Sequence, residues 1–140
     1  MTDKLIDTNI LVYAYDTSEA EKHEASKALL MKIWEEGGGV VCLQNLMEFF
    51  VDITKKVENP IKIEDAKAII KDFLQSDNWK IIDRDMETFL LAIDLIQKHN
   101  IHLWDTVIAA TMKENDLIEI ITENKKDFDK ISNIKVSVPF

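Results

Sequence analysis

Four carboxylate side chains, separated by long stretches of sequence, are the candidates for chemistry. Asp7 directly follows a short apolar run, Glu48 lies within an apolar helical pattern, and Asp105 begins another one. Asp127 follows in a polar stretch, where Asn124 could add an amide. Oxygen ligands of this kind suit Mg²⁺ or Mn²⁺, and such ions promote the hydrolysis of phosphate esters. If these side chains converge, the sequence predicts a metal-dependent hydrolase.

Each acid, taken alone, also fits an ordinary structural role. Asp105 would share a helix face with apolar residues three, four and seven positions later, so burying its charge requires a cation or hydrogen-bond donors. It could instead be the N-cap of that helix. Asp7 could form an Asx turn or a cap, Glu48 could be a solvated side chain, and the charged stretch 122–129 could be a solvated loop. Only the combination favours a metal site.

The other reactive side chains are expected to be structural. Cys42, the only cysteine, lies in an apolar run, which predicts an inert core thiol and excludes disulfides within the chain and multi-cysteine zinc sites. The histidines lack the spacing of metal ligands and are expected at the surface or at helix caps: His23, His99 and His102. The tryptophans border apolar runs and are expected in the core or an interface, not in stacking on bases: Trp34, Trp79 and Trp104.

The charge balance limits the possible partners. The chain has 140 residues, 17 of them basic and 26 acidic, with a formal net charge of −9. A protein that binds nucleic acids through bulk positive charge is therefore excluded, and an RNA substrate would require metal ions, a lysine patch or a basic partner. The length fits one domain over 1–140. Because no apolar run approaches the ~20 residues of a membrane span, we expect a cytoplasmic protein without a membrane partner.

Short apolar runs alternate with amphipathic patterns along the chain. Strands are expected at 5–6, 40–43, 80–82, 118–121 and 134–138. Helices are expected at 9–15, 19–36, 44–57, 63–76, 85–99 and 104–115. This alternation predicts an α/β protein, a three-layer α/β/α sandwich with a mostly parallel sheet. Such sheets bind ligands at the carboxyl ends of their strands, where Asp7 and Thr122 would share a crevice.

Four segments, taken in order, resemble the PIN domain and, more narrowly, the VapC-type toxin ribonucleases. They are Ile-Asp-Thr-Asn (6–9), Leu-Met-Glu-Phe-Phe (46–50), Trp-Asp-Thr-Val-Ile-Ala-Ala (104–110) and Ile-Thr-Glu-Asn-Lys-Lys-Asp-Phe (121–128). The resemblance covers essentially the whole chain. It implies an α/β/α endoribonuclease that uses Mg²⁺ or Mn²⁺ to hydrolyse RNA. It also implies the toxin of a type II toxin–antitoxin pair, a homodimer inhibited by a small antitoxin protein.

The resemblance also implies roles for individual residues. Asp7 and Asp105 match the best-attested metal ligands of the family. Glu48 matches an acid that completes the site directly or through water, and Thr8 and Asn9 would support Asp7. The reaction implied is in-line attack on an RNA phosphodiester by metal-activated water, which leaves a 3′-hydroxyl and a 5′-phosphate.

The last of the four segments departs from the family pattern. Many relatives carry an Asp two residues after the threonine that matches Thr122, whereas this chain has Asn124. Either Asp127 takes that role, or the other three acids suffice with weaker metal binding. Thr122 and Asn124 would then support the site. Single-stranded RNA would be held by exposed lysines near its mouth, for which the candidates are Lys125, Lys126 and Lys130.

Two other functions remain open on the sequence. A phosphoacceptor or small phosphatase on a similar scaffold would need a second acid after the first strand, where the chain has Asn9, and a receiver would need an Asp after the third strand, for which Asp83 is a loose match. A non-catalytic PIN-like module that pairs with an antitoxin or an RNA-processing protein would need none of the acids. The substitution at Asn124 keeps this second alternative open.

Overall fold

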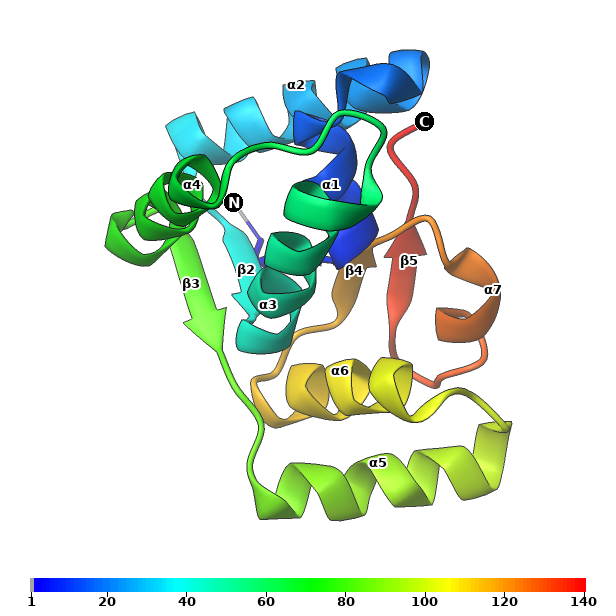
Figure 1. The fold of residues 1–140 in the computed structure, drawn as a ribbon. Helices are drawn as coiled ribbons and strands as arrows, with labels where there is room; N and C mark the ends of the chain where they lie inside the picture. The colour runs from blue at the N-terminus through cyan, green and yellow to red at the C-terminus, as the bar shows by residue number, and fades with distance from the viewer. Residues whose placement is uncertain (1) are drawn as a thin grey trace.

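Five parallel strands form one sheet in the computed structural model, which describes residues 2–140 (Figure 1). The strands lie in the order β3-β2-β1-β4-β5, and every neighbouring pair is parallel. All five overlap the segments in which the sequence predicted strands. Their bounds are Lys4–Ile6 (β1), Gly39–Cys42 (β2), Trp79–Ile82 (β3), Glu119–Ile121 (β4) and Lys135–Ser137 (β5).

Helices cover both faces of this sheet, so the predicted three-layer α/β/α sandwich is confirmed (Figure 1). One face carries α1 (Thr8–Tyr15), α2 (Ala20–Glu36), α3 (Leu43–Val51) and α4 (Ile63–Gln75). The other face carries α5 (Met86–His99), α6 (Leu103–Glu114) and the short α7 (Lys125–Phe128). Two single turns complete the described elements, a 3₁₀ turn η1 (Thr17–Glu19) and a π-helical segment η2 (Asp52–Lys56).

Neighbouring residues of a strand point to opposite faces and therefore belong to two separate cores. Leu5 packs into the core beneath α5 and α6, whereas Ile6 packs into the core beneath α1 to α4. Ile120 and Ile121 divide in the same way. Because both faces are covered, the strands are apolar at successive positions, which is why the sequence shows them as short continuous apolar runs.

The structure differs from the predicted elements around α3. Leu43 was expected to end a strand but begins α3 directly after β2. The side chain of Asn45 explains this early start, since its Oδ1 accepts the N–H of Cys42 at 2.9 Å. The predicted helix at 44–57 also changes its winding at Asp52, where the N–H of Val57 donates to the Asp52 carbonyl at 3.1 Å.

The stretch 125–128 is a second difference, because it forms α7 where a solvated loop was one of the alternatives. Phe128 anchors this turn, since it is completely buried in the core beneath α5 and α6. The charged residues around it are exposed or half-buried. One buried aromatic side chain is therefore what ties this polar segment to the sheet.

Gly39 begins β2 at a point where no side chain fits. A Cβ at this position would lie 2.5 Å from Ile33 Cγ2 and 2.6 Å from Trp79 Cε3. We predict that Gly39→Ala lowers the free energy of unfolding by about 1–3 kcal/mol, because overpacking pushes α2 and β3 away from the strand. Urea unfolding would measure the change, with the exposed Ser132→Ala as the control. Equal stability of Gly39→Ala and the parent protein would contradict this account of the packing.

The strand order creates a switch point between β1 and β4. From β1 the chain passes to β2 and β3 on one side, and it then returns to β4 and β5 on the other side. The N–H of Asp7 donates to the carbonyl of Ile121 at 3.0 Å, so the carboxyl ends of β1 and β4 lie side by side. Ligands of open α/β sheets bind at the carboxyl ends of the strands beside such a switch.

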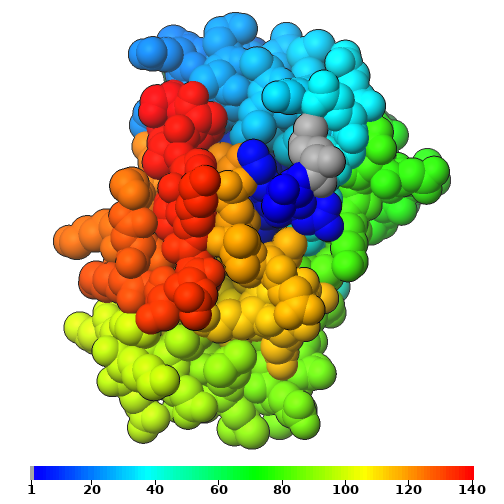
Figure 2. Space-filling view, turned by 180° about the vertical axis from the view of Figure 1, so that it is seen from behind, coloured from blue at the N-terminus to red at the C-terminus, as the bar shows by residue number. Residues whose placement is uncertain are grey.

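The reverse side of the molecule exposes the C-terminal segment (Figure 2). β5 forms one edge of the sheet, and Figure 2 shows its residues (red) on the surface between the α2 layer (light blue) and α5 (yellow-green).

None of the helices in residues 2–140 is both long and apolar enough to span a bilayer.

Candidate functional site

Asp7 lies at the end of β1 and caps the N-terminus of α1, and it is only 6% exposed. Its Oδ1 accepts the N–H of Thr8 at 2.8 Å and Nδ2 of Asn45 at 3.2 Å. Its Oδ2 accepts the hydroxyl of Thr122 at 2.8 Å. Burial raises the pKa of Asp7, and these donors oppose that shift. The expected cap is present, but the carboxylate is also held by side chains from two distant segments.

Asn45 is a residue of this site that the sequence analysis missed. It is completely buried on α3, and its Nδ2 also donates to Thr8 Oγ1 at 3.0 Å. The Thr8 hydroxyl in turn donates to Glu48 Oε1 at 2.9 Å. A signal was present in the sequence, because Asn45 lies one helical turn before Phe49 and so on the buried face. A buried amide requires polar partners, and here these are Asp7 and Thr8.

Glu48 lies on the exposed side of α3, at the border of its apolar face as the sequence predicted. Its carboxylate is nevertheless partly enclosed. Partial burial raises the pKa of Glu48, the Thr8 hydroxyl lowers it, and the nearby Asp7 charge raises it further. Hydrogen bonds through Thr8 and Asn45 therefore link Glu48 to Asp7, and the two carboxylates repel each other.

Asn124 connects the remaining acids at the end of β4. Its Nδ2 donates to Asp105 Oδ2 at 3.0 Å and to Asp127 Oδ2 at 3.3 Å. Its backbone N–H donates to Thr122 Oγ1 at 3.0 Å, and Thr122 itself donates to Asp7. A continuous set of hydrogen bonds thus runs from Asp7 to Asp105 and Asp127. The amide of Asn124 lies between two carboxylates and donates to both.

Asp105 lies in the first turn of α6 but is not its N-cap. The N-cap is His102, so that structural alternative for Asp105 is wrong. Burial is the largest cause that raises the pKa of Asp105 to about 6, and the charges of Asp7 and Asp127 raise it further. His102 acts in the opposite direction. Mutual repulsion among carboxylates is relieved when a cation binds among them.

The acids form a hydrogen-bonded network and not a closed metal cage. Within residues 2–140, no three His, Cys, Asp or Glu side chains come close enough together to hold a metal ion between them. Thr8, Asn45, Thr122 and Asn124 instead separate the carboxylates and join them. The donor chemistry still fits Mg²⁺ or Mn²⁺, because Mg²⁺ commonly binds through one or two carboxylates and keeps several water ligands.

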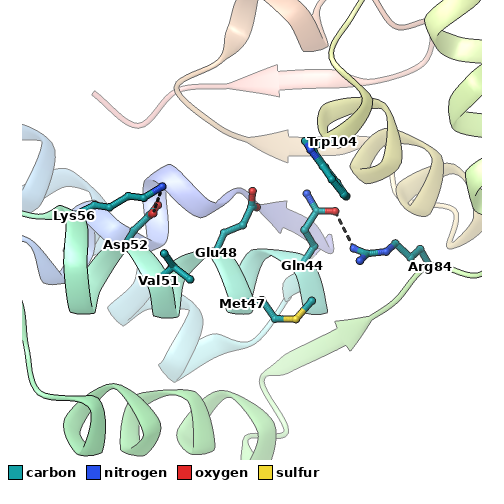
Figure 3. Close-up of a pocket in the computed structure, with 8 residues that line it drawn as sticks. All are labelled: Gln44, Met47, Glu48, Val51, Asp52, Lys56, Arg84 and Trp104. Atoms are coloured by element: carbon teal, nitrogen blue, oxygen red, sulfur yellow. Dashed lines mark hydrogen bonds and ion pairs between the residues drawn. The ribbon is translucent and has the colours of Figure 1, made fainter.

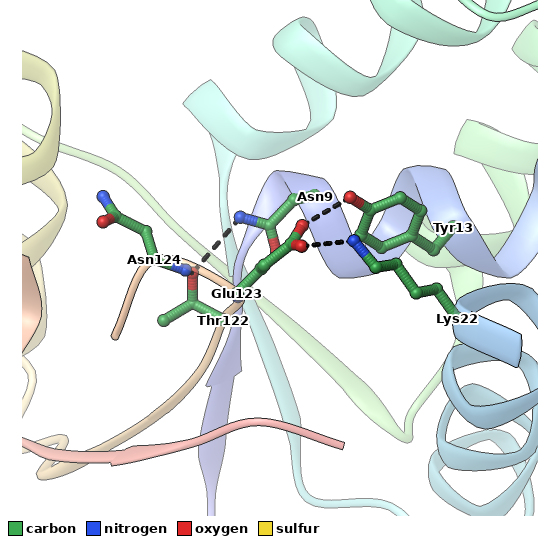
Figure 4. A network of polar contacts seen from close by, with 6 residues as sticks. All are labelled: Asn9, Tyr13, Lys22, Thr122, Glu123 and Asn124. Atoms are coloured by element: carbon green, nitrogen blue, oxygen red, sulfur yellow. Dashed lines mark hydrogen bonds and ion pairs between the residues drawn. The ribbon is translucent and has the colours of Figure 1, made fainter. Parts of the chain in front are cut away.

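A second polar network supports the turn after β4 (Figure 4). Asn9 donates from Nδ2 to Thr122 Oγ1 at 3.2 Å, and its Oδ1 accepts the N–H of Glu123 at 3.1 Å. The Glu123 carboxylate accepts the Tyr13 hydroxyl, and it accepts Lys22 Nζ at 2.6 Å. Asn9 therefore hydrogen-bonds to the turn that carries Thr122 and is linked to Asp7 through the Thr122 hydroxyl.

Cys42 and His102 lie where the sequence predicted them, whereas His23 does not. Cys42 is buried, as predicted, and burial raises the pKa of its thiol to about 12. His102 is an exposed cap, also as predicted. The surface expectation is wrong for His23, which is 8% exposed, with Nδ1 lying 2.8 Å from the Tyr13 carbonyl oxygen. α2 packs against α1 at this point and encloses the ring.

The three tryptophans do not share one environment. Trp34 and Trp79 pack against Phe73 with ring centroids 4.9 and 4.8 Å from it, as expected of core residues. Trp104 is 56% exposed, so a core position is wrong for it. It lies in the first turn of α6, directly before Asp105, and lines a cavity together with Gln44 and Glu48 of α3.

Asn45→Ala would remove the donor that Asp7 and Thr8 share. We predict that this variant binds Mn²⁺ about tenfold more weakly, because residues behind a metal ligand typically contribute ten- to hundredfold in affinity. It should also lower the free energy of unfolding by about 1–3 kcal/mol, since buried acceptors lose their partner. Calorimetric titration and urea unfolding measure the two effects. Ser132→Ala serves as the control, and unchanged Mn²⁺ affinity in folded Asn45→Ala would contradict this role.

Comparison with known proteins identifies a family and solved structures that share this fold. The model of the PIN domain family matches residues 4–134. No curated protein matches the sequence. Solved structures with the same fold include a toxin–antitoxin complex from Klebsiella pneumoniae, which is 24% identical, has a TM-score of 0.71 and aligns over 99% of this chain and 98% of that chain.

Two further solved structures share this fold. VapBC2 from Rickettsia felis, bound to a DNA fragment from its promoter, is 20% identical over 98% of both chains, with a TM-score of 0.70. VapC20 from Mycobacterium tuberculosis, described as a Sarcin-Ricin loop cleaving toxin, is 10% identical, with a TM-score of 0.69. It aligns over 89% of this chain and 92% of that chain. At such low identities the likeness establishes the fold.

Proposed function

This chain belongs to the PIN domain family, and from that premise we propose that it is a metal-dependent endoribonuclease, the toxin of a type II toxin–antitoxin pair. One observation carries the proposal. The buried carboxylate of Asp7 is linked through Thr122 and Asn124 to Asp105, at the switch point of the sheet. The solved toxin structures with this fold support the same function, since VapC20 is described as a Sarcin-Ricin loop cleaving toxin.

Asp7 and Asp105 would hold the divalent cation, with Glu48 as a further ligand. The raised pKa values of these three acids support this, because repulsion and burial are what a bound cation offsets. When bound, such an ion lowers the pKa of water and offsets the charge of the phosphate oxygens. Asp127 lies next to Asp105 through the shared Asn124 amide, which makes it the candidate for the fourth acid.

The remaining residues of the site orient these acids. Thr8, Asn45 and Thr122 donate to Asp7 and its neighbours, and they fix the carboxylate with one oxygen turned to α3 and the other to β4. Asn124 holds Asp105 from the same side as Thr122. A preorganised arrangement of this kind avoids the cost of reordering the acids during the reaction.

We propose that the substrate is a single-stranded segment of RNA. Lysines near the end of β4 are exposed, although Lys125 pairs with Asp129 at 2.7 Å and Lys130 with Asp127 at 3.8 Å. Lys126 lies beside them on α7 and is exposed. Since the net charge is −9, RNA binding should depend on the divalent cation more than on these side chains.

The test is to incubate the purified protein with total RNA and Mn²⁺ and to sequence the cleaved ends. We expect cleavage that stops with EDTA and returns with excess Mn²⁺, and ends that carry a 3′-hydroxyl and a 5′-phosphate. Cleavage of equal rate in EDTA would contradict metal dependence. Absence of any cleavage by the protein, free of antitoxin, would contradict the nuclease assignment.

A non-catalytic binding module is the second candidate, and two observations favour keeping it. Within the described chain no three acids converge closely, and Asn124 stands in place of an acid. Calorimetric titration with Mn²⁺ separates the two functions, because a module without a metal site has no binding that depends on Asp105. Under both proposals the partner is a small antitoxin protein, which the solved toxin–antitoxin complexes of this fold support. From the resemblance to the VapC-type toxins we propose that the chain also forms a homodimer.

A further inference from the structure

A cavity of about 460 Å³ opens beside the proposed catalytic acids, between α3 and the beginning of α6 (Figure 3). Glu48 lines it and is at the same time hydrogen-bonded to Thr8 of the acid network. Trp104, the residue directly before Asp105, lines it from α6. The cavity therefore adjoins the proposed site for the scissile phosphate through Glu48 and Trp104, and its size is that of a pocket for a small organic group.

Trp104 supplies an exposed aromatic surface to this cavity. Its side chain is 56% exposed, although large apolar side chains without a partner are costly to leave in water. The guanidinium carbon of Arg84 lies 6.0 Å from the centre of its ring. Exposed aromatic rings beside an arginine are the surfaces on which unpaired bases stack in proteins that bind single strands.

Gln44 supplies a buried hydrogen-bond donor to the same cavity. The residue is only 6% exposed, and its Oε1 accepts Arg84 Nη1 at 3.0 Å. Its Nε2 is buried and has no hydrogen-bond partner among the described residues. Figure 3 shows the oxygen turned to Arg84 and the nitrogen turned away from it. The Gln44 side chain also lowers the pKa of Glu48, so the amide nitrogen lies near the Glu48 carboxylate at the edge of the cavity.

The charges around the cavity favour a neutral ligand group over a phosphate. Glu48 and Asp52 are balanced by Lys56 and Arg84, so the lining has no net charge. Lys56 also lies 3.7 Å from Asp52, and Arg84 is engaged with Gln44. A phosphate placed here would meet two carboxylates, whereas a flat neutral ring would not be repelled.

From the cavity, the exposed ring and the buried Gln44 amide, we propose that this pocket is a nucleobase subsite. It takes an unpaired base of the RNA next to the phosphodiester that is cut, with the base stacked on Trp104 beside the Gln44 amide. This rests on the proposed function, because it assumes an RNA substrate. It assigns to Trp104 and Gln44 the positioning of the substrate relative to Asp105.

The test compares Trp104→Ala and Trp104→Phe with Ile118→Ala, which is a similarly exposed apolar residue, 59% exposed, at the opposite end of β4. The first measurement is binding of a labelled single-stranded RNA of ~12 nucleotides in Ca²⁺, followed by fluorescence anisotropy. We expect Trp104→Ala to weaken binding about tenfold or more, because base stacking on an aromatic ring contributes that much. Trp104→Phe should retain most of the affinity, and Ile118→Ala all of it.

The second measurement is cleavage of the same RNA in Mn²⁺. For Trp104→Ala we expect KM to rise about tenfold while kcat changes little, because the lost contact lies outside the reacting atoms. Gln44→Met should raise KM in the same direction, provided that thermal unfolding shows a folded protein. If that variant does not fold, the exposed Arg84→Met tests the same corner of the cavity, since Arg84 holds the Gln44 amide in place.

The outcomes distinguish this proposal from the proposed function. If the parent protein cleaves RNA and Trp104→Ala has the same KM and affinity, the subsite is overturned and the nuclease stands. If the parent binds RNA through Trp104 but does not cleave it, Trp104 stands as a site for an unpaired base, whereas the nuclease and the position of that base beside a cut bond are both overturned. If the parent does not bind RNA, both are overturned. If Trp104→Ala weakens the binding of the co-expressed antitoxin but not the binding of RNA, the cavity is a protein-docking site and the subsite is likewise overturned.

Discussion

Replacing Asp7 by Asn should lower the rate of RNA cleavage in Mn²⁺ by more than about a hundredfold. Residues behind a metal ligand already contribute ten- to hundredfold, so the loss of a ligand should exceed that range. The variant should fold, because Asn is as good an N-cap as Asp and can still accept the N–H of Thr8. The Thr122 hydroxyl loses the acceptor that Asp7 Oδ2 supplies and already accepts from Asn9 and Asn124, so we expect the folded variant to have a lower free energy of unfolding than the parent.

Asp105→Asn should lose activity to a similar extent, since its carboxylate lies on the other side of the same hydrogen-bonded network. The matched control is Asp129→Asn, an exposed acid that is paired with Lys125 and does not contact the network. Rates come from time courses on one RNA, and circular dichroism checks the fold. Metal-dependent cleavage by Asp7→Asn or Asp105→Asn at the parental rate would refute the assignment of that acid.

Lowering the pH should weaken Mn²⁺ binding and cleavage together. Burial, followed by the charges of Asp7 and Asp127, raises the pKa of Asp105 to about 6. Because a protonated carboxyl is a poor ligand, each pH unit below the pKa reduces the ionised fraction about tenfold, and affinity should fall ~30-fold between pH 7 and pH 4.5. Calorimetric titration at several pH values measures this. A profile that stays flat from pH 7 to pH 5 would contradict it.

Without metal, the same pKa shift should affect stability in the opposite direction. The folded-state pKa of Asp105, about 6, lies above the ordinary aspartate pKa of 3.8, so the folded state binds the proton more tightly. The resulting stabilisation is complete below about pH 4 and is lost as the pH rises through 6. Since the residue is half-exposed, solvent screening reduces the effect to about 1 kcal/mol.

Urea unfolding in EDTA tests this sign. Asp105→Asn should be about 1 kcal/mol more stable than the parent at pH 8, because it removes a carboxylate that is repelled by its neighbours. The two proteins should be equally stable near pH 4, where Asp105 is protonated. A parent protein that is the more stable of the two at pH 8 without metal would show that the Asp105 charge is already compensated within the protein.

The elements of the fold could be predicted because their signals are local. Each strand is a short apolar run, and each long helix has its own apolar period. Gly37, with φ at 84°, ends α2 as expected of the glycine run at 37–39. The early start of α3 could not be predicted in this way, because it depends on the side chain of Asn45 and not on apolar periodicity.

The order of residues along the chain is enough to identify the acids that could form a site, because it places them after strands and on helices. How these acids are joined depends on the packing of distant segments against one another. Asp7 meets a hydroxyl 115 residues away in the sequence, and an amide 38 residues away, and no local pattern encodes either contact. The exposure of Trp104 likewise depends on the tertiary packing around it. A residue's burial depends on what packs over it, which is a property of the assembled layers and not of its neighbours in sequence.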